Sequence, residues 1–278
     1  MRDFYGDPLR LELLSQLSGF RQAGGQAVSP HGAGLFTYCT VNRERFRQLR
    51  LDHPVLAVVL SGSKEIWQGD RQERLTTGAV FVLPAGVDLD IVNDPDGRSG
   101  VYEAMILEIT PDRLPDDLPA VGRRQGAGHT VPLSAALIEA LRHAATEVAC
   151  GAGSGHVRQA RMTELLALLA EEPAAAPLFA LPLEERLRRM FRARPDRDWR
   201  CAEVARSLGL SDATLRRKLR GQGAGFSDLL RTERMGVARD LLEGGMASGA
   251  VALSVGYASR AHFARSYRAV HGCNPSGG

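Results

Sequence analysis

The chain has 278 residues, of which 44% are hydrophobic and 24% are charged, and its formal net charge is +3. This length is enough for two domains with separate cores, and no apolar run approaches the ~20 residues of a membrane-spanning helix. Residues 1–4 lack the apolar stretch of a secretory signal. The four cysteines are far apart and form no Cys-x-x-Cys pair, which argues against a zinc site or a disulfide framework and predicts a cytoplasmic protein.

The first part of the chain is predicted to be mainly β-structure. Residues 9–20 have the pattern of a short amphipathic helix or arm. From residue 34 to about residue 109, short apolar runs alternate with turn residues, most clearly at 55–60, 64–68, 79–83 and 102–109. Short strands at this spacing favour a sandwich or a barrel.

Helical patterns follow a Pro-, Gly- and Arg-rich connector at 111–132. Apolar residues recur at helical spacing over 133–148 and again over 157–169. The second pattern is wide and leucine-rich, so it indicates either a subunit interface or packing against its own domain. The segment 172–177 has two prolines around three alanines and is predicted to be a linker.

The positive charge is concentrated in the last hundred residues. Residues 179–278 contain 18 Arg or Lys and 10 Asp or Glu, a net charge of +8. The preceding 178 residues contain 17 basic and 22 acidic groups, a net charge of −5. A basic C-terminal domain indicates a polyanionic partner, and arginine, which makes up nearly all of the charge, suits bidentate contacts with phosphate and guanine.

This basic region contains one pattern twice. In each copy an Ala (205, 252) is followed four residues later by a Gly (209, 256), then by an apolar residue and a Ser (211, 259). Glycine allows the left-handed turn after a first helix, and the serine caps a second helix. The second copy has one extra residue between its Gly and its Ser.

The two copies match position by position after the capping serine. Apolar residues follow at the fourth and eighth places and arginines at the sixth and ninth, namely Leu215, Leu219, Arg217 and Arg220 in the first copy and Phe263, Tyr267, Arg265 and Arg268 in the second. Helical spacing puts the apolar pair on one buried face and the arginine at the sixth place on the outward face. This predicts two helix-turn-helix units, each with a second helix that enters the major groove.

A long amphipathic helix is predicted between the two copies, over residues 226–242. Its candidates for the core are Leu229, Leu230, Val237, Ala238, Leu241 and Leu242. A rigid helix here fixes the distance between the two recognition helices, which then read major-groove faces about 34 Å apart.

These residues resemble the DNA-binding domain of the AraC/XylS family of bacterial transcription regulators over about 180–276. The matching features are Trp199, the Ala-x-x-x-Gly-Leu-Ser stretch at 205–211, residues 221–226, Arg234, Ala238, 241–242, 251–252, 255–257, Phe263 and 272–275. The resemblance implies a sequence-specific regulator that binds double-stranded promoter or operator DNA, works with RNA polymerase and forms a homodimer. The implied DNA-binding positions are Ser211, Asp212, Ala213, Thr214, Arg216, Arg217 and Arg220 in the first unit, and Ser259, Arg260, Ala261, His262, Arg265 and Arg268 in the second.

The second helix-turn-helix copy departs from the family pattern at Gly244, Gly245 and Gly249. The chain ends at 275–278, short of the usual Tyr-Arg end. Each glycine inside a helix costs about 1 kcal/mol relative to alanine. We therefore expect the second helix-turn-helix copy to be less rigid than the first.

The stretch from Gly78 to Asn93 resembles the second signature of the cupin β-barrel, with Leu89 in place of the metal-binding histidine. Leu49, Leu51 and Val55 occupy positions near those of the first signature's ligands. Leucine and valine cannot bind a metal, and His31, His53 and His129 have no ligand-like spacing. We therefore predict no metal, no cofactor and no catalytic residue, and a protein that is not an enzyme.

A barrel mouth is a common place for a small-molecule pocket. Trp67, Tyr38, Phe36, Phe81 and Tyr102 are candidates either to line such a pocket or to form the core.

The predicted architecture is α+β and multidomain. It comprises a cupin-like β-barrel sensor at 1–125, a helical dimerisation region and linker at 126–178, and an all-α domain with two helix-turn-helix units at 179–278. The predicted function is transcription regulation in response to an unknown small-molecule effector. Two alternatives remain: a barrel that serves only protein interaction or dimerisation, and a metal-dependent cupin enzyme fused to a DNA-binding domain.

Overall fold

The computed structural model of the chain describes residues 7–21, 27–115, 128–151, 155–221 and 223–275. The chain divides into two compact units, Met1–Ala180 and Leu181–Gly278, here called the first and the second unit. The boundary expected at 125/126 and the N-terminal four residues lie outside the described residues. No described helix is long and apolar enough to cross a membrane.

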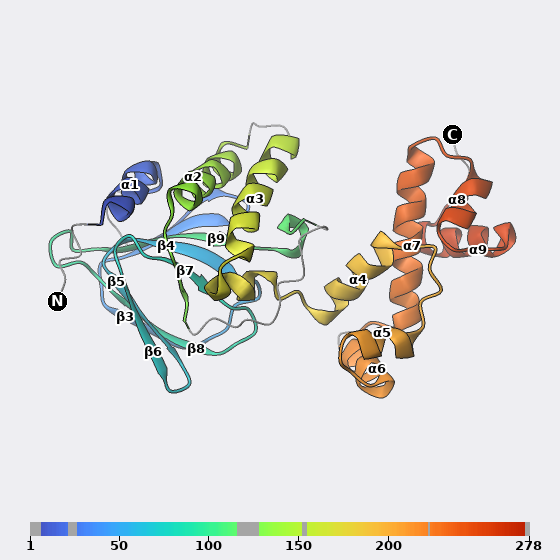
Figure 1. Ribbon diagram of the computed structural model, residues 1–278, viewed down its shortest axis with the longest axis horizontal. Helices are drawn as coiled ribbons and strands as arrows, with labels where there is room; N and C mark the ends of the chain where they lie inside the picture. The colour runs from blue at the N-terminus through green and yellow to red at the C-terminus, as the bar shows by residue number, and fades with distance from the viewer. Residues whose placement is uncertain (1–6, 22–26, 116–127, 152–154, 222, 276–278) are drawn as a thin grey trace. The chain divides into compact units, whose positions relative to one another are not determined.

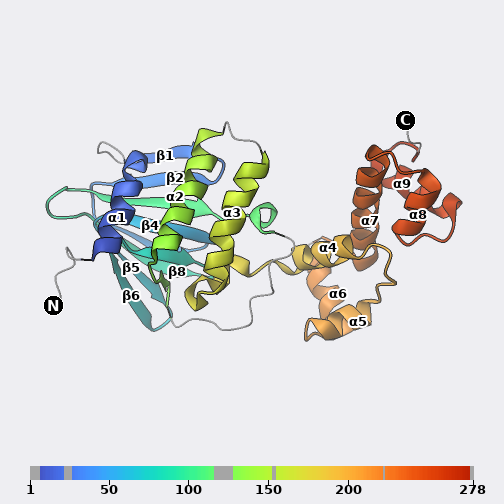
Figure 2. The same ribbon diagram turned by 45° about the horizontal axis from the view of Figure 1, so that its top comes forward.

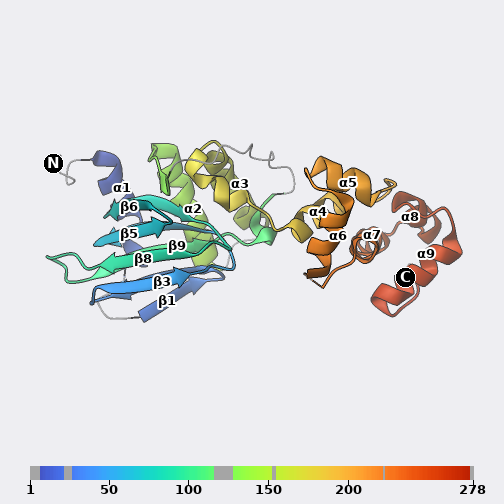
Figure 3. The same ribbon diagram turned by 90° about the horizontal axis from the view of Figure 1, so that it is seen from below.

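The first unit contains two antiparallel sheets (Figures 1 and 3). The six-stranded sheet has the order β1 (Ala27–Gly32), β2 (Leu35–Thr40), β9 (Tyr102–Glu108), β4 (Val55–Ser61), β7 (Val80–Leu83) and β10 (Thr130–Val131). The four-stranded sheet has the order β3 (Glu44–Leu49), β8 (Leu89–Asp94), β5 (Ser63–Gln68) and β6 (Arg71–Thr76). In the described part of the chain the two sheets form a sandwich, so the predicted β-domain is confirmed but its barrel is not closed.

The core of the first unit lies between the two sheets. Alternate residues of β4, such as Val55 and Val59, point into this core together with Phe81, Leu89 and Tyr102. All seven residues of β4 are buried, because the other face of its sheet is covered by helices. Figure 2 shows α1 (Pro8–Gln16), α2 (Ala135–Cys150) and α3 (Gly155–Ala170) over that face. Burial on both faces explains why β4 reads as a continuous apolar run.

The leucine-rich helix α3 packs against its own unit. Met162, Leu165, Leu166 and Leu169 are all buried there, while Val157 is exposed. Of the two interpretations of this helix, packing within the domain accounts for its buried face. A role in dimerisation stays a prediction.

The prediction that residues 172–177 form a linker is wrong. This segment belongs to a 3-10 helix, Pro173–Phe179, that packs on β7 and β10. Ala175 and Leu178 are 0% and 1% exposed. Small side chains let the backbone lie directly on the sheet, and the composition of the segment does not distinguish this packing from a free linker.

The second unit is entirely helical among its described residues. It contains α4 (Leu183–Ala193), α5 (Cys201–Ser207), α6 (Asp212–Gly221), α7 (Phe226–Glu243), α8 (Ser248–Ser254) and α9 (Arg260–His271). In Figure 1, α5 and α6 lie beside one end of α7, and α8 and α9 lie beside the other. One core, with Phe191 and Leu215, joins α4 to α6 and the start of α7, and another, with Met235 and Phe263, joins the end of α7 to α8 and α9.

Of the residues predicted for the core face of α7, Leu229, Ala238 and Leu242 are buried, and the remaining three are half-buried. Glu233 and Met235 are also buried and were not predicted. The helix has 18 residues, which corresponds to a length of about 27 Å.

Candidate nucleic-acid interface

The two turns of the second unit have the same backbone geometry. Gly209 and Gly256 adopt left-handed conformations, with φ of +69° and +79°. The amide of Leu210 donates to the carbonyl of Ala205, and the amide of Tyr257 donates to the carbonyl of Ala252, both at 2.8 Å. The sequence repeat is therefore a structural repeat, and the two helix-turn-helix units are confirmed. We call them the first motif (α5 and α6) and the second motif (α8 and α9).

Each motif begins its second helix in the same way. The Ser211 hydroxyl accepts a hydrogen bond from the amide of Thr214 at 3.2 Å, and the Ser259 hydroxyl accepts one from the amide of His262 at 3.4 Å. The predicted anchors are buried: Leu215, Leu219, Phe263 and Tyr267 are 0%, 1%, 1% and 5% exposed. These contacts fix which face of α6 and α9 points outward.

The outward face of α6 contains both paired and unpaired arginines. Arg216 forms an ion pair with Asp212 at 3.0 Å, and the Nε of Arg220 donates to the carbonyl of Arg216 at 3.4 Å. Arg217 is exposed and has no intramolecular hydrogen bond or ion pair within the described residues. Of the remaining predicted positions, Ser211 and Ala213 are exposed and Thr214 is half-buried.

The outward face of α9 repeats this arrangement. All six predicted positions from Ser259 to Arg268 are exposed. Arg268 donates through Nε to Asn274 Oδ1 at 2.9 Å, and the Arg260 guanidinium lies over Gly249, within 2.5 Å of where a Cβ would be. Arg265, like Arg217, has no hydrogen bond or ion pair within the part of the chain that the structure describes. The sixth place after each cap therefore presents an unengaged guanidinium.

The helix α7 makes polar contacts with α4 and with the segment between α4 and α5 that the sequence did not reveal. The Glu233 carboxylate is 6% exposed and pairs with Arg192 Nε of α4 at 2.9 Å and also with Arg188. The next residue, Arg234, donates to the carbonyls of Pro195 (2.8 Å) and Arg197 (2.9 Å).

Arg234 also reaches the second motif, because its guanidinium lies 5.7 Å from the ring centroid of Tyr257. Adjacent residues of one helix thus contact α4, the segment that leads into the first motif, and the turn of the second motif. The spacing of Arg188 and Arg192, four residues apart on one helical face, was the only signal in the sequence for a buried acidic partner.

The glycines expected to loosen the second motif do not interrupt a helix. Gly244 follows the last residue of α7, and Gly245 takes a φ of +83° while the Met246 amide donates to the carbonyl of Leu241 at 3.1 Å. Such a left-handed residue is a common way to end a helix. Gly249 lies in the first turn of α8 and makes room for Arg260. The predicted loss of rigidity does not follow from these positions.

The positions that correspond to cupin metal ligands lie in or against the apolar core of the first unit. Leu89 is 0% exposed, Val55 is 5% exposed, and Leu49 and Leu51 are half-buried. His31 Nε2 lies 2.8 Å from Thr37 Oγ1, and His129 Nδ1 lies 3.0 Å from the carbonyl oxygen of Val82. Both of these histidines therefore have partners within the unit.

The aromatic candidates in the first unit are divided between core and surface. Phe81 and Tyr102 are 1% and 0% exposed and belong to the core, whereas Trp67 is 37% exposed. Phe36 and Tyr38 are half-buried.

Two helix-turn-helix motifs on one basic unit define a DNA-binding protein. The sequence of residues 204–277 matches the family model described as a helix-turn-helix domain. A DNA-binding transcriptional dual regulator from Escherichia coli K-12 is 30% identical over 34% of this chain and 88% of that chain, with a TM-score of 0.33. The chain is a DNA-binding transcription regulator whose C-terminal helix-turn-helix domain is of the AraC type.

Other solved structures have lower sequence identity to this chain. The C-terminal domain of AraT, a response regulator from Geobacillus stearothermophilus, is 26% identical over 34% of this chain and 81% of that chain, with a TM-score of 0.32. ToxT from Vibrio cholerae, in a structure with a bound unsaturated fatty acid, is 14% identical over 87% of this chain and 92% of that chain, with a TM-score of 0.42.

Proposed function

We propose that α6 and α9 read two neighbouring major-groove segments of one DNA site, with Arg217 and Arg265 as the principal contacts. The observation that supports this most strongly is their equivalence. Both arginines stand six residues after a capping serine and have no partner among the described residues. Arginine in such a position can bind guanine through two hydrogen bonds or bind a phosphate.

The other predicted positions have smaller roles in this proposal. Arg216, Arg220 and Arg268 already contact groups of the same unit, so each must exchange an internal contact for one with DNA. The remaining positions, Ser211, Asp212, Ala213, Thr214, Ser259, Arg260, Ala261 and His262, lie at the starts of the two helices, where base edges are read.

We further propose that the first unit controls this DNA binding through a small-molecule effector. The regulator would act in the cytoplasm as a homodimer and would contact RNA polymerase. A sandwich that serves only protein interaction or dimerisation is the alternative. A ligand screen by thermal shift separates the two, because a ligand that binds only the folded state raises its melting temperature.

The DNA-contact proposal is tested by measuring affinity for a site selected from random DNA. Arg217→Ala and Arg265→Ala should each weaken binding by about 1–3 kcal/mol and relax base preference. Arg231→Ala is the matched control, because it removes the same charge from an exposed arginine of α7 that pairs with Asp228. Unchanged affinity and preference in both motif variants would contradict the assignment.

A further inference from the structure

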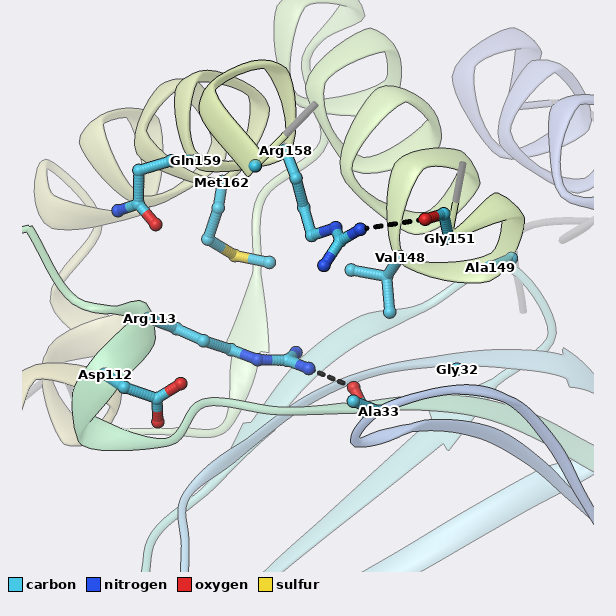
Figure 4. A pocket seen from close by; sticks show the side chains of 11 residues that line it. Gly32, Ala33, Asp112, Arg113, Val148, Ala149, Gly151, Arg158, Gln159 and Met162 are labelled. Carbon is cyan, nitrogen blue, oxygen red and sulfur yellow. Dashed lines mark hydrogen bonds between the residues drawn. The ribbon is translucent and has the colours of Figure 1, made fainter. Parts of the chain in front are cut away.

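A pocket of 540 Å³ opens on the helical side of the first unit, outside the sandwich core. It lies between the turn after β1, the short helix Pro111–Arg113, the end of α2 and the start of α3 (Figure 4). Its volume is within the range of small-molecule sites. Its lining combines the apolar side chains of Val148 and Met162 with the charged side chains of Asp112, Arg113 and Arg158.

Close backbone packing supports one wall of the pocket. A Cβ on residue 32 would lie 2.3 Å from the carbonyl oxygen of Val148. The close contact between β1 and α2 at this point therefore requires glycine at position 32. Helix α2 ends at Cys150, and the next residue, Gly151, caps it with a left-handed φ of +62°. The wall is therefore held by direct contact between a strand and a helix end.

Two arginines enter the pocket from opposite sides (Figure 4). Arg113 donates to the carbonyl of Glu108 at 3.0 Å and to that of Ala33. Arg158 donates to the carbonyl of Gly151 at 3.2 Å. Neither guanidinium forms an ion pair within the described residues, and the Nε of Arg158 is buried without a hydrogen-bond partner. Backbone carbonyls thus orient both groups while leaving N–H donors available.

The pKa of Arg113 is set by burial and by charges of both signs near the pocket. Burial is the main reason that the pKa of Arg113 is lowered, and the charge of Arg158 acts in the same direction with the smallest effect of the groups nearby. The carboxylates of Asp112 and Glu108 act in the opposite direction, and they do not cancel the shift. Figure 4 shows the carboxylate of Asp112 apart from both guanidinium groups. Two like charges facing one pocket repel each other, and an anion between them offsets that repulsion.

We propose that this pocket binds a small organic anion, with its carboxylate or phosphate group between Arg113 and Arg158 and its apolar part against Met162 and Val148. Arginine provides the planar, paired donors that both anionic groups need. Such a ligand would join the end of α2 to the start of α3. The inference deepens the proposed effector response by giving the effector a charge and a place outside the sandwich core.

The test is a thermal-shift and calorimetric titration of the full chain with sodium phosphate and, separately, with sodium succinate, at constant ionic strength set with sodium chloride. Arg158→Gln is the informative variant, because Arg158 makes one internal hydrogen bond through its guanidinium, whereas Arg113 holds two carbonyls. Arg161→Gln is the control, since Arg161 pairs with Glu164 on the same helix and does not line the pocket.

We expect saturable binding of one or both anions by the wild-type chain, at least tenfold weaker binding by Arg158→Gln, and binding by Arg161→Gln within twofold of wild type. The inference is overturned if neither anion binds saturably, or if Arg158→Gln binds as tightly as wild type, which would show that the anion binds away from Arg158. DNA affinity of the same preparations is measured separately. If the wild-type chain binds DNA selectively but binds neither anion, only this inference is refuted. If it binds an anion but does not bind DNA selectively, the proposed DNA contacts are refuted.

Discussion

Lys64 provides a prediction about pH and stability. It is one of only two lysines in the chain, and it points from β5 into the sandwich core, where it is 5% exposed. Its Nζ donates to Asn93 Oδ1 at 2.6 Å and lies 5.9 Å and 5.3 Å from the ring centroids of Phe81 and Tyr102. Because burial penalises the charged form, it lowers the pKa of Lys64 from 10.5 to about 7.

The sign of the effect follows from proton counting. Between pH 7 and pH 10 the unfolded chain keeps a proton on Lys64 that the folded chain has lost, so the free energy of unfolding rises with pH. The full pKa shift corresponds to about 5 kcal/mol, and the change from pH 7.5 to pH 8.5 is about 1 kcal/mol. Burial raises the pKa of Tyr102 and that of the Cys201 thiol, the latter to about 11. Tyr102 lowers stability only above about pH 9, whereas Cys201 begins to do so near pH 8. Cys201 belongs to the second unit, so its effect is separate from the unfolding of the first unit.

The assay is urea unfolding of Lys64→Met and its parent at pH 7.5 and 8.5. A Trp199→Phe background leaves Trp67 of the first unit as the only tryptophan. We expect the parent to gain about 1 kcal/mol over this range and Lys64→Met to gain none from this position. Lys218→Met, at the exposed lysine of α6, should behave as the parent. An equal pH dependence in Lys64→Met and its parent would refute the reasoning.

Three further predictions concern the second unit. Glu233→Gln weakens a buried carboxylate contact with two arginines and should lower the stability of this unit by about 1–3 kcal/mol in thermal unfolding, whereas Glu243→Gln, at an exposed pair, should have little effect. Gly209→Ala should cost about 1–2 kcal/mol for its left-handed backbone alone, and Gly256→Ala should cost more, because its Cβ would also lie 2.7 Å from the Arg234 guanidinium; equal losses in chemical denaturation would contradict this. Arg234→Ala should weaken binding to a site with both half-sites more than binding to a single half-site in a gel-shift titration, and equal weakening would show that Arg234 does not couple the motifs.

The local features of the DNA-binding unit were predictable because they depend on residues close together in the sequence. The caps at Ser211 and Ser259, the left-handed glycines and the buried anchors all follow from spacing within one helix-turn-helix. The same reasoning failed at Glu233, because its partners are about 40 residues away on α4. A carboxylate is expected at the surface unless the sequence also shows which arginines neutralise it.

Features of the first unit that depend on tertiary packing were less predictable. The segment 172–177 has the composition of a linker, yet Ala175 is buried on the sheet. Lysine is expected at the surface, but Lys64 faces the core. The candidate anion site joins Arg113 and Arg158, which come from a connector and a helix start 45 residues apart. Their convergence appears only when the chain is folded.

The most direct test of the central claim, that two equivalent motifs read one DNA site, is hydroxyl-radical and methylation footprinting on a selected site with the wild-type chain, Arg217→Ala and Arg265→Ala. We predict two protected major-groove segments about 10 base pairs apart, with each variant losing base-specific protection in a different segment. Protection of a single segment, or loss at the same base pairs in both variants, would contradict the account.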